Sequence, residues 1–271
     1  MDKILLVDYL NLVHRSNIRF GPPEPDKVSY AIVYNFVRSL RAVVEKFEPQ
    51  KVFVCFEGSK NFRYALFQDY KANRIIKRAS SAAKEVDRQR DIITNLLQYL
   101  PVTTALADRF EADDVVSALC QNLKNEEVII LSSDSDFIQL LQNKEIPNVK
   151  LFNPALKDFV SPPSHHYLGC KILAGDKKTD NIPGLMSLKK ATEMIQNPKL
   201  LEEFLSVEEN RAAFNLNKKL IELAPIPENE LILTDGNFDL KALREEFARM
   251  EFKTILTDKY WATFSETFGK L

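Results

Sequence analysis

Short apolar runs that lead into an acidic residue recur along the first half of the sequence, and they constrain the fold more than any other feature. Three runs share this pattern: Lys3–Val7 before Asp8, Lys51–Phe56 before Glu57, and Glu127–Leu131 shortly before Asp134. Each is short enough for a strand that is buried on both faces. The stretches between them carry apolar residues at helical spacing, as in Ser29–Phe47. This alternation predicts an α/β fold with a mostly parallel twisted sheet and helices on both faces.

A cluster of three carboxylates within four residues precedes one of the predicted helices. Glu111, Asp113 and Asp114 stand before the apolar run Val115–Cys120. The helix dipole favours acidic residues in a first turn by about 0.3–1 kcal/mol each, which explains one or two of them. A third places like charges a few ångströms apart, which disfavours ionisation unless a cation lies between them. The cluster is therefore either a charged helix start or part of a metal site.

Further carboxylates fall at predicted strand ends or in one loop between helices. Ligands of open parallel sheets bind at the carboxyl ends of the strands, so we expect these side chains at one rim. Any one of them could cap a helix, but nine are too many for caps. Oxygen ligands without His or Cys select hard cations such as Mg²⁺ or Mn²⁺, and two such ions about 3.5–4 Å apart hydrolyse phosphodiesters. The predicted ligands are Asp8, Glu57, Glu111, Asp113, Asp114, Asp134, Asp136, Asp176 and Asp180.

The composition excludes several other classes of protein. Hydrophobic residues make up 45% and charged residues 28%, as in soluble globular proteins. The sequence lacks an apolar stretch long enough for a membrane span, and its N-terminus is too quickly acidic for a signal peptide. The three cysteines are single and widely spaced, which predicts reduced core residues in a cytoplasmic protein. The three histidines lack partners at ligand or catalytic spacing and are assigned structural or surface roles.

The charge is unevenly distributed although the formal net charge is only −1. Residues 60–90 contain nine Lys or Arg against three acids, whereas residues 202–271 contain nine against fourteen. A basic segment on a nearly neutral protein is typical of a surface that binds phosphates. Because the apolar helical face begins only near Ile92, we expect residues 72–90 to form a mobile arch above the carboxylate rim.

Several short motifs occur in a characteristic order over most of the chain. They are Val7-Asp8 with Asn11, Phe56-Glu57-Gly58, Asn61-Phe62-Arg63, Tyr70–Arg74, Phe110–Asp114, Ser133–Phe137, Gly175-Asp176 with Asp180–Gly184, and Glu251-Phe252-Lys253. This order resembles the flap endonuclease/5′-nuclease family, in particular phage 5′-3′ exonucleases and the 5′-nuclease domain of bacterial DNA polymerase I. The resemblance implies a PIN-like nuclease core with a helical helix–turn–helix region after it.

The resemblance also implies roles for individual residues. The carboxylates at 8, 57, 111, 113 and 114 would hold a first metal, and those at 134, 136, 176 and 180 a second. Lys71 and Arg74 would approach the scissile phosphate with Arg63 in the same basic stretch, and Tyr70 would stack on the terminal base. The remaining predicted DNA contacts are Lys77, Arg78, Lys84, Lys177, Lys178, Lys189 and Lys190.

Three positions depart from the family pattern. Glu57 stands where the family has Asp, and one extra residue separates Asp176 from Asp180. The Gly-x-Gly hairpin that grips duplex phosphate in the family reads Leu185–Lys190 here. Backbone N–H contacts in this hairpin would therefore give way to lysine contacts.

The resemblance implies a Mg²⁺-dependent 5′-3′ exonuclease and flap endonuclease with two ions, for which Mn²⁺ substitutes. Its expected partners are DNA with 5′ ends or flaps and RNA–DNA hybrid primers, together with a single-strand-binding protein or a polymerase during replication and repair. We expect a monomer without membrane contact, in the host cytoplasm if it is phage-encoded. The expected domains are a nuclease core at 1–161 and a helical DNA-binding region at 162–271.

Three other interpretations remain open. A haloacid-dehalogenase-like phosphatase also uses an Asp at a strand end and a loop like residues 175–180, but it needs a second Asp two positions after the nucleophile, where Leu10 follows Asp8. A catalytically inactive nucleic-acid-binding relative would usually have lost acidic ligands, which this chain retains. A single-strand ribonuclease of the PIN type would be shorter and would lack the basic segment.

Overall fold

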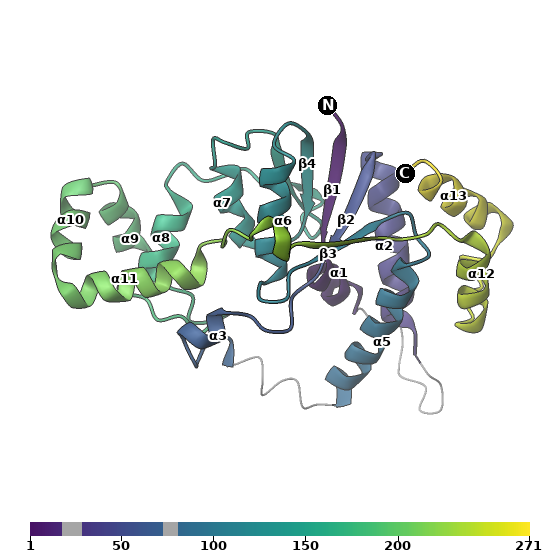
Figure 1. The fold of residues 1–271 in the computed structure, drawn as a ribbon, viewed down its shortest axis with the longest axis horizontal. Coiled ribbons are helices and arrows are strands. Elements are labelled where there is room, and N and C mark those ends of the chain that lie inside the picture. Colours follow the sequence, from purple (N-terminus) through teal and green to yellow (C-terminus); the bar gives the residue numbers. More distant parts are fainter. Residues whose placement is uncertain (18–28, 73–80) are drawn as a thin grey trace.

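A computed structural model describes residues 1–17, 29–72 and 81–271 of the chain (Figure 1). Its strands are β1 (Lys3–Asp8), β2 (Lys51–Cys55), β3 (Thr103–Leu106), β4 (Glu127–Leu131), β5 (Val149–Asn153), β6 (Asp158–Phe159) and β7 (Ile232–Asp235). Its α-helices are α1 (Tyr9–Ser16), α2 (Ala31–Phe47), α3 (Arg63–Leu66), α5 (Ser81–Leu97), α6 (Ala112–Asn122), α7 (Ile138–Leu141), α8 (Tyr167–Ala174), α9 (Leu188–Ile195), α10 (Pro198–Ser206), α11 (Glu208–Ile221), α12 (Leu240–Arg249) and α13 (Asp258–Phe268). Two 3₁₀ turns are η1 (Ser135–Phe137) and η2 (Glu228–Glu230). Within the described ranges, every helix is too short or too polar to cross a membrane.

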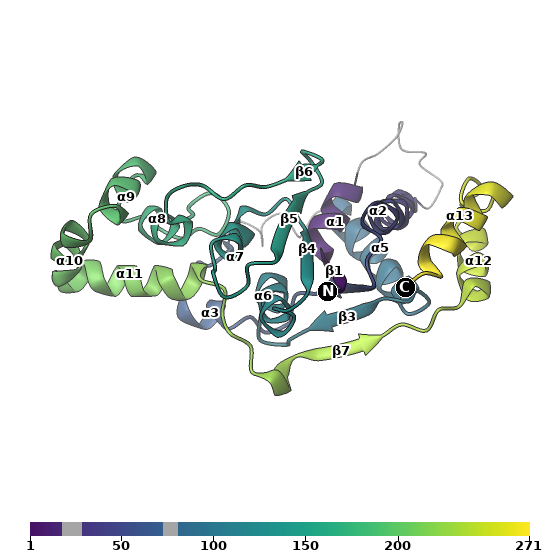
Figure 2. The same cartoon turned by 90° about the horizontal axis from the view of Figure 1, so that it is seen from above.

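The described residues form one seven-stranded sheet in the order β6-β5-β4-β1-β2-β3-β7. The five strands from β5 to β3 in this order are parallel, and the two edge strands are antiparallel to their neighbours. Figure 2 shows α1, α2 and α5 on one side of the sheet and α6 and α7 on the other. The predicted α/β class with a mostly parallel sheet is confirmed. Because its parallel strands end at the same edge, the sheet collects the residues that follow them.

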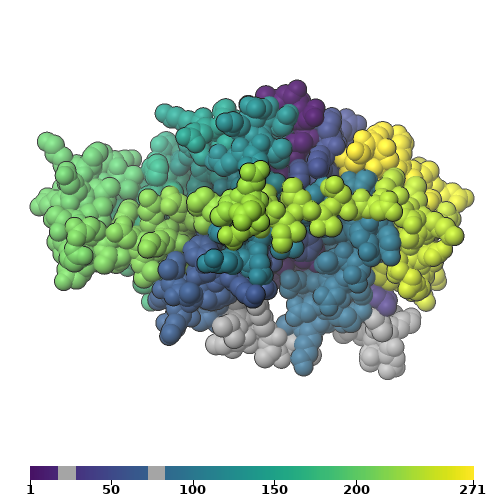
Figure 3. All heavy atoms as spheres, in the orientation of Figure 1, coloured from purple at the N-terminus to yellow at the C-terminus, as the bar shows by residue number. Residues whose placement is uncertain are grey.

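The C-terminal part of the chain divides between the two ends of the molecule. Helices α8 to α11 lie at one end, whereas α12 and α13 lie at the other, with α13 against α2 (Figures 1 and 2). The chain between α11 and α12 crosses the molecule as a continuous yellow-green band in Figure 3 and adds β7 to the sheet beside β3. The single helical region expected at 162–271 is thus two packing units. The sequence did not reveal this because β7 is four residues long and exposed throughout.

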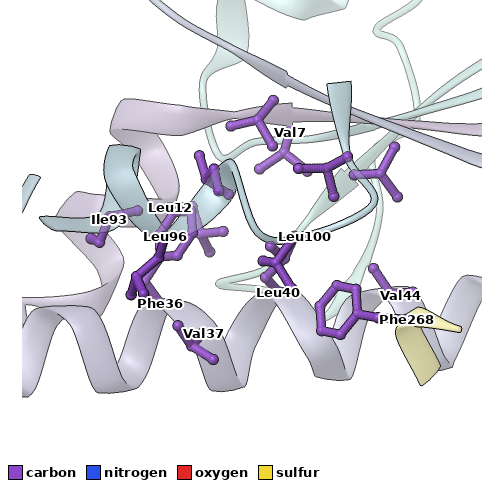
Figure 4. Packing of buried hydrophobic residues seen from close by; sticks show 14 of the residues in the cluster. Val7, Leu12, Phe36, Val37, Leu40, Val44, Ile93, Leu96, Leu100 and Phe268 are labelled. Carbon is purple, nitrogen blue, oxygen red and sulfur yellow. The ribbon is translucent and has the colours of Figure 1, made fainter. Parts of the chain in front are cut away.

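Two hydrophobic clusters cover the two faces of the sheet, as the alternating pattern of a strand requires. Leu5 and Val7 of β1 face the larger cluster, and Ile4 and Leu6 face the other. Figure 4 shows the larger cluster, in which side chains of α2 and α5 meet the strand residues and Phe268 of α13. This core fixes the sheet rigidly, so its carboxyl edge is a firm base for a site.

Helix α5 begins earlier than the apolar pattern suggested. It starts at Ser81, and Gln89, which is 1% exposed, accepts hydrogen bonds from the backbone N–H groups of Ile32 (2.9 Å) and Val33 (3.3 Å) at the start of α2. Residues 81–90 of the expected arch are therefore helical, with a polar residue making the packing contact. Residues 73–80 of that arch lie outside the described residues.

Candidate metal-binding cavity

An open cavity of about 520 Å³ lies at the carboxyl edge of the sheet. It is lined by eight of the nine carboxylates expected there and by two lysines, Lys71 and Lys171. The eight are Asp8, Glu57, Glu111, Asp113, Asp134, Asp136, Asp176 and Asp180. They come from the ends of β1, β2 and β4, the start of α6 and the loop after α8. The parallel sheet thus brings together residues that are up to 172 positions apart in the sequence.

Asp8 is fixed between the end of β1 and the start of α1. Its Oδ1 accepts the backbone N–H of Asn11 at 3.1 Å and caps the helix, and its Oδ2 accepts the hydroxyl of Ser132 at 2.8 Å. Burial raises the pKa of Asp8 to about 6, and the negative charges of Asp134 and Glu57 act in the same direction. The carboxylate is oriented precisely but lacks a compensating positive charge in these contacts.

Asp113 and Asp136 share this environment. Burial raises the pKa of Asp113 well above its ordinary value, and Asp134, Asp8 and Glu111 add repulsion. Burial also raises the pKa of Asp136, against the attraction of Lys171. Buried carboxylates that face one another are stabilised by a cation between them, and an all-oxygen set suits a hard divalent ion. The donor chemistry of the cavity therefore fits Mg²⁺ or Mn²⁺.

Asp114, the ninth expected ligand, points away from the cavity. Its Oδ2 accepts Nη1 of Arg63 at 2.6 Å, and its Oδ1 accepts Nη2 at 2.8 Å. The same two oxygens also accept the backbone N–H of Glu111 (3.1 Å) and of Ala224 (2.7 Å). Both side chains are almost fully buried, and Arg63 also donates to the carbonyl groups of Leu220 and Glu222. The structure therefore corrects two expectations: Asp114 is not positioned to bind the metal, and Arg63 is not positioned to contact a phosphate.

Lys71 and Glu111 form an ion pair inside the cavity wall. Lys71 has a left-handed backbone, with φ of 54°, and its N–H donates to the carbonyl of Asp180 at 3.0 Å. Burial alone would raise the pKa of Glu111, but Lys71 and Arg63 hold it below the ordinary value. A positive φ is uncommon for a lysine and persists only where the surrounding structure enforces it. The turn that presents Lys71 is therefore held in this conformation by its surroundings.

Tyr70 is buried, which corrects the expectation that it stacks on a base. Its side chain is 1% exposed, packs with Ile172, Ile182 and Leu220, and donates its hydroxyl to Glu111 Oε2 at 2.9 Å. Its ring faces the neighbouring Tyr64 edge-on at 5.7 Å. Tyr70 thus orients Glu111 from behind, with its face unavailable to a nucleotide.

Lys171 is a cavity residue that the sequence reasoning missed. It pairs with Asp136, and its Nζ lies 3.2 Å from Asp176 Oδ2. The attraction of Asp136 raises the pKa of Lys171 although burial opposes it. The sequence feature that could have identified Lys171 is its position as the one charged residue of the otherwise apolar helix Tyr167–Ala174.

The loop after α8 accommodates the extra residue between its two acids. Asp176 and Ile182 exchange two backbone hydrogen bonds, and the N–H of Asp180 donates to the carbonyl of Asp176 at 3.2 Å. Gly175 enters this loop at φ of 69°, where a Cβ would also lie 2.6 Å from the backbone N of Gly184. Asp180 remains 8% exposed and lines the cavity, so the longer spacing does not remove it from the site.

The carboxylates are gathered but not yet arranged as a coordination shell. Among the described residues, no group of three or more His, Cys, Asp or Glu side chains has converged into a metal-binding set. Glu111 and Asp136 instead hold lysines. An ion bound to these two carboxylates would compete with the lysines for their negative charge.

The other predicted DNA contacts lie outside the cavity or outside the described residues. Arg74, Lys77 and Arg78 belong to the segment 73–80, about which the structure says nothing. Five lysines are exposed and do not line the cavity: Lys84 on α5, Lys177 and Lys178 in the loop after α8, and Lys189 and Lys190 in the first turn of α9.

The family model for the 5′-3′ exonuclease, N-terminal resolvase-like domain, matches residues 3–164. The chain belongs to this family. It is 30% identical over 230 residues to the thermostable DNA polymerase I of Thermus filiformis, covering 82% of this chain and 26% of that protein. It is also 30% identical to a 5′-3′ exonuclease of Bacillus subtilis strain 168, covering 76% of this chain and 72% of that one.

Among solved structures, this 5′-3′ exonuclease family member resembles the bacteriophage T5 flap endonuclease in a pseudo-enzyme-product complex with DNA and metal ions. The two superpose with a TM-score of 0.62 at 17% identity, covering 99% of this chain and 98% of the other. This likeness concerns the fold. The chain spans about a quarter of the length of the DNA polymerase I relatives that it matches. The family resemblance inferred from the sequence motifs is confirmed.

Proposed function

We propose that the chain is a divalent-metal-dependent 5′ nuclease that hydrolyses phosphodiesters at 5′ ends, flaps and RNA primers of duplex DNA. The observation that carries the proposal is the cavity itself, where eight carboxylates and two lysines meet at the carboxyl edge of the sheet. Family membership supports it, as does the T5 flap endonuclease of the same fold that was solved with DNA and metal ions.

We propose that Asp8, Glu57, Glu111 and Asp113 hold one ion and that Asp134, Asp136, Asp176 and Asp180 hold another. Mg²⁺ is the ion that this oxygen-only set suits, with Mn²⁺ as a substitute. When bound, such ions activate a water for attack and stabilise the leaving oxygen. The chain supplies the negative charge that holds them and the fixed backbone at the ends of β1 and β4.

Lys71 is proposed to contact the scissile phosphate. In the structure its ammonium pairs with Glu111, and Lys71 already lines the cavity. A phosphate that takes Lys71 frees Glu111 for an ion, so the lysine and the carboxylate exchange partners together. Tyr70 stays on Glu111 Oε2 and keeps that carboxylate oriented during the exchange.

The remaining elements are assigned outside the cavity. The duplex would bind to helices α8 to α11 through Lys177, Lys178, Lys189 and Lys190. The 5′ strand would be contacted by Arg74, Lys77, Arg78 and Lys84. We further propose that the chain works as a monomer in the cytoplasm beside a polymerase or a single-strand-binding protein.

The test is single-turnover cleavage of a 5′-flapped duplex, a nicked duplex and an RNA-primed duplex during a Mg²⁺ titration. Wild-type protein should cleave near the junction only when the ion is present, and Asp134→Asn should bind the same substrates in Ca²⁺ without cleaving them. Hydrolysis of p-nitrophenyl phosphate in place of DNA would favour the phosphatase interpretation. Binding without cleavage by the wild type would make the chain an inactive relative, and cleavage of single-stranded RNA alone would indicate a ribonuclease.

A further inference from the structure

A second hollow lies across α1 from the acidic cavity, and its charge is the reverse. It encloses about 350 Å³ between α1, α2 and α13. Three arginines line it, Arg15, Arg38 and Arg41, together with the polar side chains of Asn35 and Tyr260. Within the described ranges the lining contains no acidic residue. The hollow is therefore a concave cationic surface that neither the family motifs nor the carboxylate site accounts for.

Two of the three arginines are held in place by the protein. Arg41 donates from Nε to the hydroxyl of Tyr260 at 3.2 Å, and its guanidinium lies 4.9 Å from the centre of that ring. Its Nη1 pairs with Glu45 at 2.9 Å. Arg15 donates from Nη2 to the carbonyl of Pro154 at 3.0 Å. Each guanidinium has five N–H donors in a fixed fork, so these contacts orient the groups and leave donors for a ligand.

The positive charges exceed what the neighbouring acids compensate. Arg38 and Arg41 are three residues apart on α2 and face the same hollow, where like charges repel. Glu45 forms an ion pair with Arg41, and the exposed Arg38 lies with its guanidinium 5.3 Å from the Tyr34 ring. An anion bound between the arginines would relieve this repulsion. A tetrahedral phosphate suits the planar forks of arginine in particular.

The hollow and the acidic cavity share helix α1 in their walls. Helix α1 presents Asn11 and His14 to the acidic cavity and Arg15 to the hollow. Pro154, which holds Arg15, directly follows β5, so it lies at the same carboxyl edge of the sheet. A nucleic acid with one phosphate in the cavity carries further phosphates at regular spacing on both sides of it. The two sites thus lie on either side of the same helix, α1.

We propose that the hollow binds a backbone phosphate of the nucleic acid whose scissile phosphate lies in the cavity. This rests on the proposed function, because it takes the cavity as the cleavage site. Arg15, Arg38 and Arg41 would act as a positioning clamp that fixes the register of the duplex. A contact to the sugar-phosphate backbone carries no direct information on the bases, so binding at the hollow should be independent of sequence.

The experiment couples a protein change to a substrate change. The 271-residue chain is bound to nicked duplexes in Ca²⁺, and each duplex carries a single methylphosphonate at a different position along one of its strands. Arg38→Gln removes an exposed charge from the hollow, and Lys124→Gln removes an exposed charge remote from both sites. Arg38→Gln should weaken binding of the unmodified duplex several-fold and lower the slope of log K against log salt by about 0.9. Lys124→Gln should change neither, and both variants should keep the wild-type melting temperature.

The decisive result is one methylphosphonate position that weakens wild-type binding but has no further effect on Arg38→Gln. Arg15→Gln should share that position. Additive losses at every position would overturn the proposal, as would an unchanged salt slope in Arg38→Gln. Weaker binding of inorganic phosphate by Arg38→Gln without a coupled position would make the hollow a site for a free anion and would also overturn it. Wild-type cleavage in Mg²⁺ is scored separately, so failure of the proposed function is distinguished from failure of the clamp.

Discussion

The first turn of α6 separates two regions that differ in how the charge of a buried carboxylate is compensated. On one side, Asp113 faces the cavity among other acids, and burial with repulsion raises its pKa. On the other side, Asp114 is buried, and Arg63 and two backbone N–H groups donate hydrogen bonds to both of its carboxylate oxygens. The cavity has carboxylates in excess of cations and is built for a ligand. The carboxylate of Asp114 already has a full set of protein partners, and its contacts fix α6 against the chain that follows α11.

The same substitution at these adjacent positions provides the strongest test. Asp113→Asn should lower single-turnover cleavage by about three orders of magnitude, because bound metal contributes several kcal/mol to the transition state. Its metal-free melting temperature should rise, since a buried charge among like charges is removed. Single-turnover kinetics and thermal unfolding in EDTA measure the two effects. Wild-type cleavage by Asp113→Asn would remove it from the proposed ligands.

Asp114→Asn should show the opposite pattern. Removing the charge of Asp114 breaks the bidentate pair and leaves the buried Arg63 with only the longer contact to Glu111, at 3.5 Å; breaking a buried pair typically costs about 3–5 kcal/mol of unfolding free energy. Urea denaturation should show this loss, whereas the cleavage rate per folded molecule should change little. The double variant Arg63→Met/Asp114→Leu should recover only part of the stability, because it removes both charges but leaves the backbone groups that they contact without these partners. A severe rate defect in a fully folded Asp114→Asn sample would contradict the distinction drawn between the two regions.

Lys71 lies on the cavity side and should behave accordingly. Lys71→Ala should reduce the single-turnover rate by about 100-fold, the effect of losing one charge-stabilising donor, with a much smaller change in affinity. Exposed lysines of α9 provide the matched comparison. Lys190→Ala should leave the rate at saturating substrate unchanged and lower the salt slope of binding by about 0.9. Equal rate and affinity profiles for the two variants would place Lys71 among ordinary backbone contacts.

The smallest expected effect is on the pH dependence of stability. The pKa of Asp8 is about 6 in the folded protein, against about 3.9 in an unfolded chain. Between these values the folded state holds more protons than the unfolded state, so stability falls as pH rises from about 4 to about 6. Metal-free protein should therefore gain about 1–2 kcal/mol between pH 6.5 and pH 5. Asp8→Asn should show a smaller gain, and a gain equal to that of the wild type would assign the effect to other groups.

Much of the fold and of the cavity follows from local patterns in the sequence. Apolar runs before Asp8, Glu57 and Asp134 identify strands, and their alternation with helices implies that these strands are parallel. Once they are parallel, geometry brings their carboxyl ends to one edge. This is why the acids of the cavity could be named before the structure, although they are far apart in the chain. The motif order was specific enough to identify the family.

The direction in which each side chain points could not be predicted from the sequence in the same way. Successive residues of a helix point about 100° apart, so Asp113 and Asp114 look equivalent in sequence but face opposite regions. Tyr70 beside Lys71 is a similar case, because the left-handed turn at Lys71 sends one side chain into the core and the other to the cavity wall. Charge pairing over long separations, such as Lys171 with Asp136, also depends on how α8 packs.

What the sequence determined by itself is the strand–helix alternation, the set of acids at its edge and the family to which the chain belongs, because these depend on local periodicity and residue type. Only the tertiary structure decided which acids remain without a cation, which basic side chains are buried, and where the chain goes after α11. The division of the C-terminal helices shows the reason. Apolar faces on α12 and α13 look like those of any amphipathic helix, and only the space left beside α2 determines that they pack there.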